Sequence, residues 1–269
     1  MVNNSALSLA TSVPVLVGIN RDELGVFFST GPSNTSTFTS FLDTVATNTV
    51  GTGPPNLVST LNLTSLSTFP GLPSTIFTAP TPSTILNATI RLTTDWLFAC
   101  NTFAKAFSAS KHAAFGPTYF FEFNRTYSPR GYTQPWCDPP ATATHPYGNP
   151  SSAEYFKCHA GEQMVVFGTE ARAGVPDRDG LDRDFMRLVV DYWAAFARNG
   201  DPNPREGWLN ARGYEGTLGE VRRVGRWEKV DANRPTMRVL QWGGRQVPLG
   251  EGHNEVCRGL GAPMDVLEA

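Results

Sequence analysis

His159 is the residue whose type and surroundings best suit proton transfer. It stands in the run Lys157-Cys-His-Ala-Gly-Glu-Gln163, after a loop rich in proline and glycine and before an apolar stretch that predicts a helix. An imidazole with an ordinary pKa of about 6.5 can exchange a proton at neutral pH. Histidines are more often structural than catalytic, so a catalytic role also requires an acid that orients the ring and a nucleophile. We expect the other three histidines to lie on the surface: His112, His145 and His253.

A predicted strand that ends in two acidic residues supplies the candidate acid. Residues 14–20 are almost continuously apolar and rich in β-branched side chains, which predicts a strand covered on both faces in a parallel sheet. Asp22 and Glu23 follow at its carboxyl end, where open α/β sheets place their sites. Carboxylates in such a turn can simply be solvated. An acid that precedes a loop-borne histidine is, however, the order found after the nucleophile in α/β hydrolases, and a buried carboxylate would fix the imidazole tautomer.

The nucleophile that such a pair serves is missing from the sequence. The motif G-x-S-x-G occurs nowhere in the chain, although the order of an α/β hydrolase places it before the acid. Gly243-Gly244 does not replace the glycine-rich oxyanion loop, because it comes too late in the chain and follows a predicted strand. We expect it to form a turn. The sequence therefore contains two of the three groups of a catalytic triad.

A zinc site is the alternative chemistry for this part of the chain. Its ligand types are present as Cys137, His145, Cys158 and His159. The adjacent pair Cys158 and His159 would point apart, and no two of the four have the spacing of a structural zinc site. We therefore expect no metal and no other cofactor.

Alternating strands and helices predict an α/β fold with a mostly parallel sheet. Helical periodicity extends over residues 83–109 and 181–198, and the second of these ends at Asn199-Gly200, a typical helix terminus. Further strands are predicted at 118–123 and 237–242, and a short helix at 253–260. Three strands are too few for a complete sheet of this class.

Two segments are predicted to be irregular. Residues 24–90 contain Asp43 as their one charged residue and are rich in serine, threonine, proline and glycine, and apolar spacing indicates short helices near 38–45 and 57–63. Residues 208–230 are charged and show no clear period. We expect the first segment to form irregular surface helices with loops.

Composition limits the classes of partner. A chain of 269 residues with 40% hydrophobic residues can bury a sizeable core. Its net charge of −2 and scattered basic residues give no reason to expect nucleic acid as a partner. No apolar run reaches the roughly 18 residues of a membrane span, and no signal peptide is visible at the start. A small, neutral or weakly charged ligand fits better.

The cysteines and glycosylation motifs indicate the secretory pathway. Four cysteines without any C-x-x-C motif can form two disulfides in an oxidising compartment, although buried thiols are the alternative: Cys100, Cys137, Cys158 and Cys257. Asn-x-Ser/Thr motifs occur at Asn3, Asn34, Asn62, Asn87 and Asn124. Such motifs are common by chance in a chain rich in serine and threonine.

Four ordered stretches resemble the type-B carboxylesterase and lipase family, which includes the cholinesterase-like proteins. The stretches are Val15-Leu-Val-Gly-Ile-Asn-Arg-Asp-Glu-Leu-Gly-Val-Phe-Phe28, Thr94-Asp-Trp-Leu-Phe-Ala-Cys100, Cys158-His-Ala-Gly-Glu162 with Phe167-Gly168, and Tyr192-Trp-Ala-Ala-Phe-Ala-Arg-Asn-Gly-Asp-Pro-Asn203. The first is similar to the acid-bearing turn of that family. The resemblance implies that Glu23 is the triad acid and His159 the triad base, and it gives Asp22 no role.

The resemblance also implies what the whole chain represents. We expect residues 1–269 to form the C-terminal part of an α/β-hydrolase domain, with an incomplete, mostly parallel sheet and flanking helices. The complete enzyme would hydrolyse small-molecule esters, would need no cofactor, and would be secreted and glycosylated with disulfides. This chain alone is expected to be a truncated, inactive fragment whose first strand has an open edge prone to aggregation. A non-catalytic, cholinesterase-like binding or adhesion module is the alternative. A disulfide between Cys137 and Cys158 is expected, because it would help to fix the direction of His159.

Overall fold

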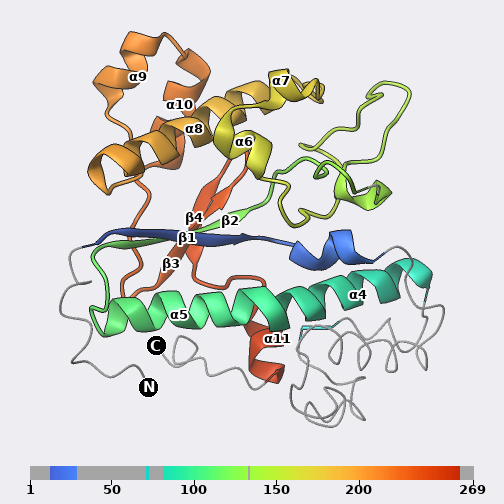
Figure 1. The fold of residues 1–269 in the computed structure, drawn as a ribbon, viewed down its shortest axis with the longest axis horizontal. Helices are drawn as coiled ribbons and strands as arrows, with labels where there is room; N and C mark the ends of the chain where they lie inside the picture. Colours follow the sequence, from blue (N-terminus) through green and yellow to red (C-terminus); the bar gives the residue numbers. More distant parts are fainter. Residues whose placement is uncertain (1–12, 29–70, 73–80, 133, 261–269) are drawn as a thin grey trace.

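A four-stranded sheet between two layers of helices forms the centre of the structure. The computed structural model describes residues 13–28, 71–72, 81–132 and 134–260. The strands follow the order β1 (Val15–Asn20), β2 (Thr118–Phe123), β3 (Thr236–Leu240) and β4 (Arg245–Pro248). Figure 1 shows α4 and α5 on one side of the sheet and α8 on the other. The predicted α/β class is therefore confirmed.

The strand pairing agrees with the predicted parallel sheet, with one addition. β1 pairs with β2 in parallel from Val15 opposite Thr118 to Asn20 opposite Phe123, and β2 pairs with β3 in parallel. β4 is antiparallel to β3 and was not predicted. The turn between β3 and β4 contains Gly243, whose φ of 78° suits a residue without a side chain. The expected turn at Gly243-Gly244 is thus confirmed.

Each face of the sheet buries its own apolar cluster, because successive side chains of a strand point to opposite faces. On β2, Phe120 packs with Phe103 and Phe107 of α5 (Cys100–Lys111) on one face. Tyr119 and Phe123 pack with side chains of α8 (Asp182–Asn199) on the other face. Side chains on both faces of β2 are therefore buried, which explains why apolar residues do not alternate with polar ones in most of its sequence.

The helix predicted at 83–109 contains an interruption. α4 (Pro82–Thr94) begins with a capping box between Thr81 and Thr84, and α5 continues to Lys111. Between them one turn, Asp95–Ala99, is a π-helix, in which the Cys100 amide donates to the Asp95 carbonyl. Single π turns inside α-helices are rare and frequently lie at functional sites. Here the turn holds the buried carboxylate of Asp95.

The prediction that residues 208–230 are irregular is wrong. The segment contains most of α9 (Glu206–Arg212) and all of α10 (Glu215–Val224). Each ends at a glycine with positive φ, which terminates a helix without steric cost. These two glycines are Gly213 and Gly225. The helices bury few apolar side chains, so charged residues hide the helical period in the sequence.

The remaining elements are short. They include α6 (Gln163–Phe167), α7 (Glu170–Ala173) and α11 (Asn254–Gly259), the last of which confirms the predicted C-terminal helix. The short helices expected near 38–45 and 57–63 lie outside the described residues. Among the helices described, none has the combination of length and apolar character that would cross a membrane.

Two disulfides use all four cysteines. Cys137 is bonded to Cys158, as expected, and Cys100 to Cys257. The alternative of buried thiols is therefore wrong, and Cys137 and Cys158 have no thiolate to offer to zinc. Asn124, one of the five glycosylation motifs, has its side-chain amide engaged with Arg21 and Gln241, whereas Asn87 is exposed on α4.

The three histidines expected at the surface have different environments. His112 is exposed at the end of α5, and His145 is half-buried within hydrogen-bonding distance of Asn149. The prediction for His253 is wrong, because this residue is only 1% exposed. Its ring lies between the carboxylates of Asp95 and Glu122, which supply the compensation that a buried polar ring requires.

Candidate active site

The Glu23 carboxylate is held by the turn that follows β1. The chain leaves the strand at Asn20 and enters one turn of 3₁₀-helix at Glu23–Phe27. The Asn20 backbone amide donates to Glu23 Oε1 over 2.7 Å, and the Leu24 amide donates to the Thr94 hydroxyl at the end of α4. Glu23 is buried. Its side chain is thus fixed by the end of the strand rather than solvated.

His159 stands in a tight turn directly before α6. Ala160 has a φ of 62°, a left-handed conformation that is uncommon for a residue with a side chain. A side chain at Gly161 would place its Cβ 2.5 Å from the Tyr127 carbonyl oxygen, so only glycine fits there. The Tyr127 amide donates to the Gly161 carbonyl over 3.1 Å. These constraints determine where His159 points.

The structure brings Glu23 and His159 together, although 136 residues separate them. His159 Nδ1 lies 2.6 Å from Glu23 Oε2, and the His159 amide donates to the Glu23 carbonyl. The hydrogen bond to Glu23 raises the pKa of His159 above its usual value, and nearby Glu162 adds to this while burial opposes it. Donation from Nδ1 to a carboxylate leaves the lone pair of a neutral imidazole on Nε2.

The exposure of the two partners differs as a proton-transfer pair requires. The Glu23 side chain is 8% exposed and the His159 side chain 44% exposed. No hydrogen bond to a described residue occupies Nε2 of His159. The arrangement can therefore orient an imidazole with a buried acid while its other nitrogen remains open to a reactant.

Neighbouring groups attach the acid turn to the histidine turn. Asn20 Nδ2 donates to the Cys158 carbonyl over 3.0 Å and to the Glu162 carboxylate. Asp22 accepts from the Lys157 amide over 2.9 Å, and its own amide donates to the Lys157 carbonyl. Asp22 was given no role from the sequence, and here it joins the two turns rather than contacting His159.

The Cys137–Cys158 disulfide lies next to the residue before His159. A Cβ at Gly25 would meet Cys158 Sγ at 2.6 Å, so the acid turn packs directly on the disulfide. Trp136 Nε1 donates to the Gly25 carbonyl over 2.9 Å. The loop before His159 is therefore closed by its own disulfide, packs on the acid turn and is hydrogen-bonded to it.

Aromatic side chains that the sequence did not indicate surround the imidazole. The Phe98 ring lies 5.6 Å and the Phe27 ring 6.0 Å from the His159 ring, centre to centre. Tyr132 makes an edge contact with Phe27, and both are partly exposed. Phe27 follows Glu23 closely in sequence, which could have indicated it. Phe98 and Tyr132 come from distant segments and leave no local pattern.

Comparisons with known proteins identify a family from the sequence and a fold from the structure. The sequence model of the carboxylesterase family matches residues 2–247. Among solved structures, one described as PNB esterase is similar with a TM-score of 0.52 at 19% sequence identity. The match covers 90% of this chain but only 38% of that esterase. At this identity it shows the fold alone, which is part of an α/β-hydrolase fold. No protein of curated description matches.

Proposed function

The chain belongs to the carboxylesterase family, and from this premise we propose that Glu23 and His159 are the acid and the general base of a carboxylic-ester hydrolase. The observation that carries the proposal is the bond between His159 Nδ1 and Glu23 Oε2. It leaves Nε2 free on a partly exposed ring, as a general base requires.

In the complete enzyme His159 accepts a proton and then donates it, once during acylation of the serine and once during hydrolysis of the acyl-enzyme. Its Nε2 takes the proton of a serine hydroxyl while the serine oxygen attacks the ester carbonyl, and it then gives that proton to the departing alkoxide. Water attacks the acyl-enzyme in the same way and releases the acid. Glu23 stays unprotonated, holds the ring through Nδ1 and stabilises the imidazolium. The substrate is a small-molecule ester, and lipid esters fall within the same reaction class.

The serine that this mechanism needs is supplied from outside these 269 residues, since the sequence contains no G-x-S-x-G. The chain spans less than two fifths of the esterase structure that it resembles. Residual catalysis without a nucleophile depends on an oxyanion hole, whose usual glycine-rich loop is also missing. We propose that residues 1–269 are one part of the catalytic domain and have no esterase activity alone.

Hydrolysis of p-nitrophenyl acetate by the purified chain tests this proposal. Wild type and His159→Ala should give the same background rate. Turnover by the wild type that His159→Ala abolishes would contradict it. The transcript upstream of Met1 supplies the positive arm: a longer chain with an in-frame G-x-S-x-G should hydrolyse the ester, and Glu23→Gln should lower its kcat about 10⁴-fold, as for other triad acids.

A non-catalytic binding module is the second candidate, and the missing nucleophile motif favours it. A longer transcript without G-x-S-x-G, or a longer chain that contains this motif but shows no turnover, would decide for this alternative. We also propose secretion, which is supported by the two disulfides. Of the two motifs within the described residues, Asn87 is the exposed one at which a glycan would attach.

A further inference from the structure

Tyr127 supports the turn that carries His159. Its amide donates to the Gly161 carbonyl over 3.1 Å. A Cβ at Gly161 would meet the Tyr127 carbonyl oxygen at 2.5 Å and Thr126 Cβ at 2.9 Å, so both residues pack directly against the turn. Tyr127 is only 4% exposed. Its position therefore limits the positions that the His159 turn can adopt.

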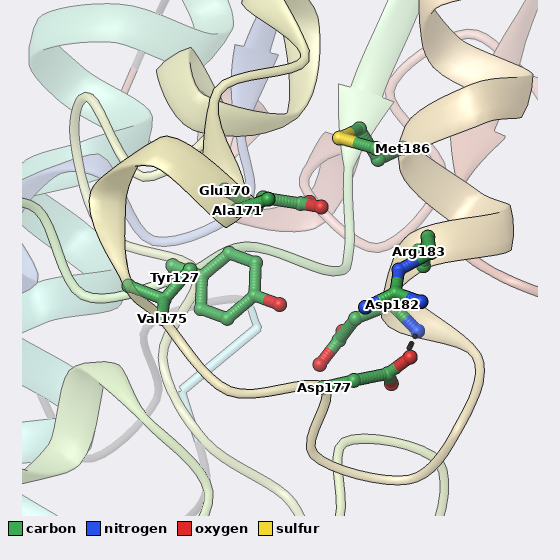
Figure 2. A pocket seen from close by; sticks show the side chains of 8 residues that line it. All are labelled: Tyr127, Glu170, Ala171, Val175, Asp177, Asp182, Arg183 and Met186. Carbon is green, nitrogen blue, oxygen red and sulfur yellow. Dashed lines mark hydrogen bonds between the residues drawn. The ribbon is translucent and has the colours of Figure 1, made fainter.

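A guanidinium group covers the Tyr127 ring. Arg178 Cζ lies 4.0 Å from the centre of the ring, and the Tyr127 hydroxyl donates to the Pro176 carbonyl over 3.0 Å. Figure 2 shows this ring at the edge of a small pocket of about 40 Å³, which Glu170 also lines. Because the ring borders this space, apolar packing alone does not enclose it. The buried contact with Arg178 is attractive and contributes to fixing the orientation of the ring.

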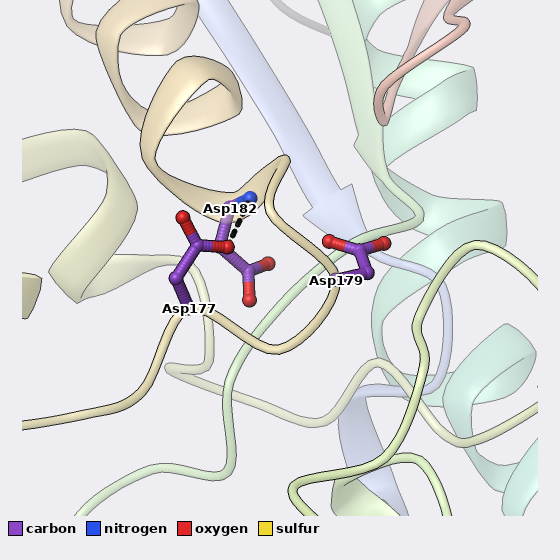
Figure 3. Close-up of side chains that lie close together, drawn as sticks. All are labelled: Asp177, Asp179 and Asp182. Atoms are coloured by element: carbon purple, nitrogen blue, oxygen red, sulfur yellow. Dashed lines mark hydrogen bonds between the residues drawn. The ribbon is translucent and has the colours of Figure 1, made fainter. Parts of the chain in front are cut away.

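A carboxylate fixes the plane of the Arg178 guanidinium. Asp182 is one of three aspartates that each place a carboxylate oxygen within 4.8 Å of the others (Figure 3). It accepts from Arg178 Nε over 2.9 Å and from Nη2 over 3.0 Å, which is the two-bond geometry that orients a guanidinium. Arg125 donates to both Asp179 and Asp182, so two guanidinium groups compensate these two carboxylates.

The charged state of Asp182 agrees with this arrangement. Burial alone would raise the pKa of Asp182, but the hydrogen bonds and charge of Arg178, together with the charge of Arg125, outweigh it and lower the pKa to about 2. Asp182 is therefore a carboxylate at neutral pH. It stands in the first turn of α8, so the guanidinium plane is anchored to the longest helix beside the sheet.

Stability alone does not explain why an arginine is buried here. Apolar side chains of similar volume can often replace a buried ion pair without loss of stability. A guanidinium offers what they lack, because its edge donates two parallel hydrogen bonds while its face stacks on an aromatic ring. In Arg178 the edge meets Asp182 and the face meets Tyr127. Its Nη1 also donates to Asp138, the residue after the disulfide-bonded Cys137.

We propose that Arg178 is a positioning residue for His159. Asp182 orients the guanidinium, the guanidinium stacks on Tyr127, and Tyr127 holds the turn at Gly161 so that His159 Nδ1 meets Glu23. Arg178 itself would touch neither substrate nor the imidazole. The inference rests on the proposed role of His159 as a general base.

NMR titration of ¹⁵N-labelled chains tests the positioning role. Arg178→Lys keeps a positive charge beside Asp182 but loses the plane that stacks on Tyr127. We expect its His159 pKa to fall from the raised wild-type value toward about 6.5, because the bond to Glu23 is made less often. Exchange of the Tyr127 amide should become about 10- to 30-fold faster, which corresponds to the loss of one desolvated cation–π contact.

Substitutions of Tyr127 make the test independent of whether Arg178→Lys folds. Tyr127→Leu leaves the charges of both ion pairs in place but removes the ring, and it should lower the His159 pKa as Arg178→Lys does. Tyr127→Phe keeps the ring beneath the guanidinium and should retain the wild-type pKa. An equal effect of Tyr127→Phe and Tyr127→Leu would overturn the proposal, since the hydroxyl rather than the stacked ring would then position the turn.

A second arginine–tyrosine pair provides the matched control. Arg187 Cζ lies 4.2 Å from the centre of the Tyr214 ring, and Arg187 pairs with Asp184 over 3.0 Å in a partly exposed position. Arg187→Lys should leave the His159 pKa and the Tyr127 exchange rate unchanged. Equal changes in Arg187→Lys and Arg178→Lys would overturn the proposal. A His159 pKa that falls in Glu23→Gln but not in Arg178→Lys would also overturn it, and would leave the proposed general base intact.

Discussion

His159 and His253 both pair with carboxylates, but their surroundings differ in burial and in the use of the second ring nitrogen. His159 Nδ1 contacts Glu23, and Nε2 has no partner among the described residues. His253 lies between two acids, with Nδ1 at Asp95 and Nε2 2.8 Å from Glu122. The His253 side chain is 2% exposed and the His159 side chain 44%. One ring can exchange a proton with a reactant, whereas the other is enclosed by its partners.

The difference shows that a histidine–carboxylate pair is not in itself a catalytic feature. Both nitrogens of His253 are engaged, and the ring packs against Phe103 in the core between α5 and the sheet. Asp95 and Glu122 raise the pKa of His253 to about 9 despite the opposing effect of burial. His253 is therefore an imidazolium at neutral pH that joins α11 to the π turn and to β2. A base needs the opposite, one open nitrogen and a pKa near the working pH.

Replacing His253 should have the largest effect on stability. His253→Leu leaves Asp95 and Glu122 buried without the positive charge between them, so we expect a loss of about 3 to 5 kcal/mol in the free energy of unfolding. Urea denaturation measures this loss. His112→Leu, at an exposed position, should change stability by no more than about 0.5 kcal/mol. A loss below about 1 kcal/mol for His253→Leu would show that the positive charge of His253 does not compensate the carboxylates of Asp95 and Glu122 as described.

The pH dependence of stability should separate the two histidines further. The pKa of His253 is about 9 when folded and near its ordinary value when unfolded, so its contribution is fully present below about pH 6.5 and is lost as the pH rises through 9. The contribution amounts to about 3 kcal/mol. Unfolding of wild type and His253→Gln should be compared from pH 6 to 9.5.

Glu170 also has a raised pKa, which lowers stability as the pH rises through 8. Because wild type and His253→Gln both contain Glu170, the difference in stability between them reports His253 alone. We expect the two stability curves to converge toward high pH. Parallel curves over this range would contradict the charged state assigned to His253.

Replacing His159 should have a smaller effect on folding. His159→Ala removes a partly exposed ring but leaves Glu23 Oε2 without its partner in a buried position. We expect a loss of about 1 to 2 kcal/mol, close to the cost of one unsatisfied buried acceptor. Thermal unfolding, compared with His112→Ala, measures it. A loss as large as that of His253→Leu would mean that the two pairs do not differ in the way described.

Local periodicity explains which elements could be predicted from the sequence. The strand at 15–20 is an almost continuous apolar run. The helix at 182–199 repeats apolar residues at helical spacing, and Gly200 marks its end. α9 and α10 bury only a few side chains and were missed. β4 was missed for a related reason, since its four residues alternate over too short a length to stand out.

Contacts between distant segments could not be predicted in the same way. The proximity of Glu23 and His159 was anticipated because ordered motifs resemble a family in which these positions meet. No motif connects His253 with Asp95 and Glu122, which lie 158 and 131 residues away. Phe98 was likewise placed beside His159 by the course of the π turn, which has no sequence pattern of its own.

A titration of the histidine rings by NMR tests the central claim, that Glu23 orients His159 as a base with an open Nε2. In ¹⁵N-labelled wild type the His159 pKa should lie above its ordinary value, and the neutral ring should carry its proton on Nδ1. In Glu23→Gln the pKa should fall toward about 6.5, while His253 remains doubly protonated through neutral pH in both proteins. An unchanged His159 pKa, or a neutral ring protonated on Nε2 in the wild type, would contradict the claim.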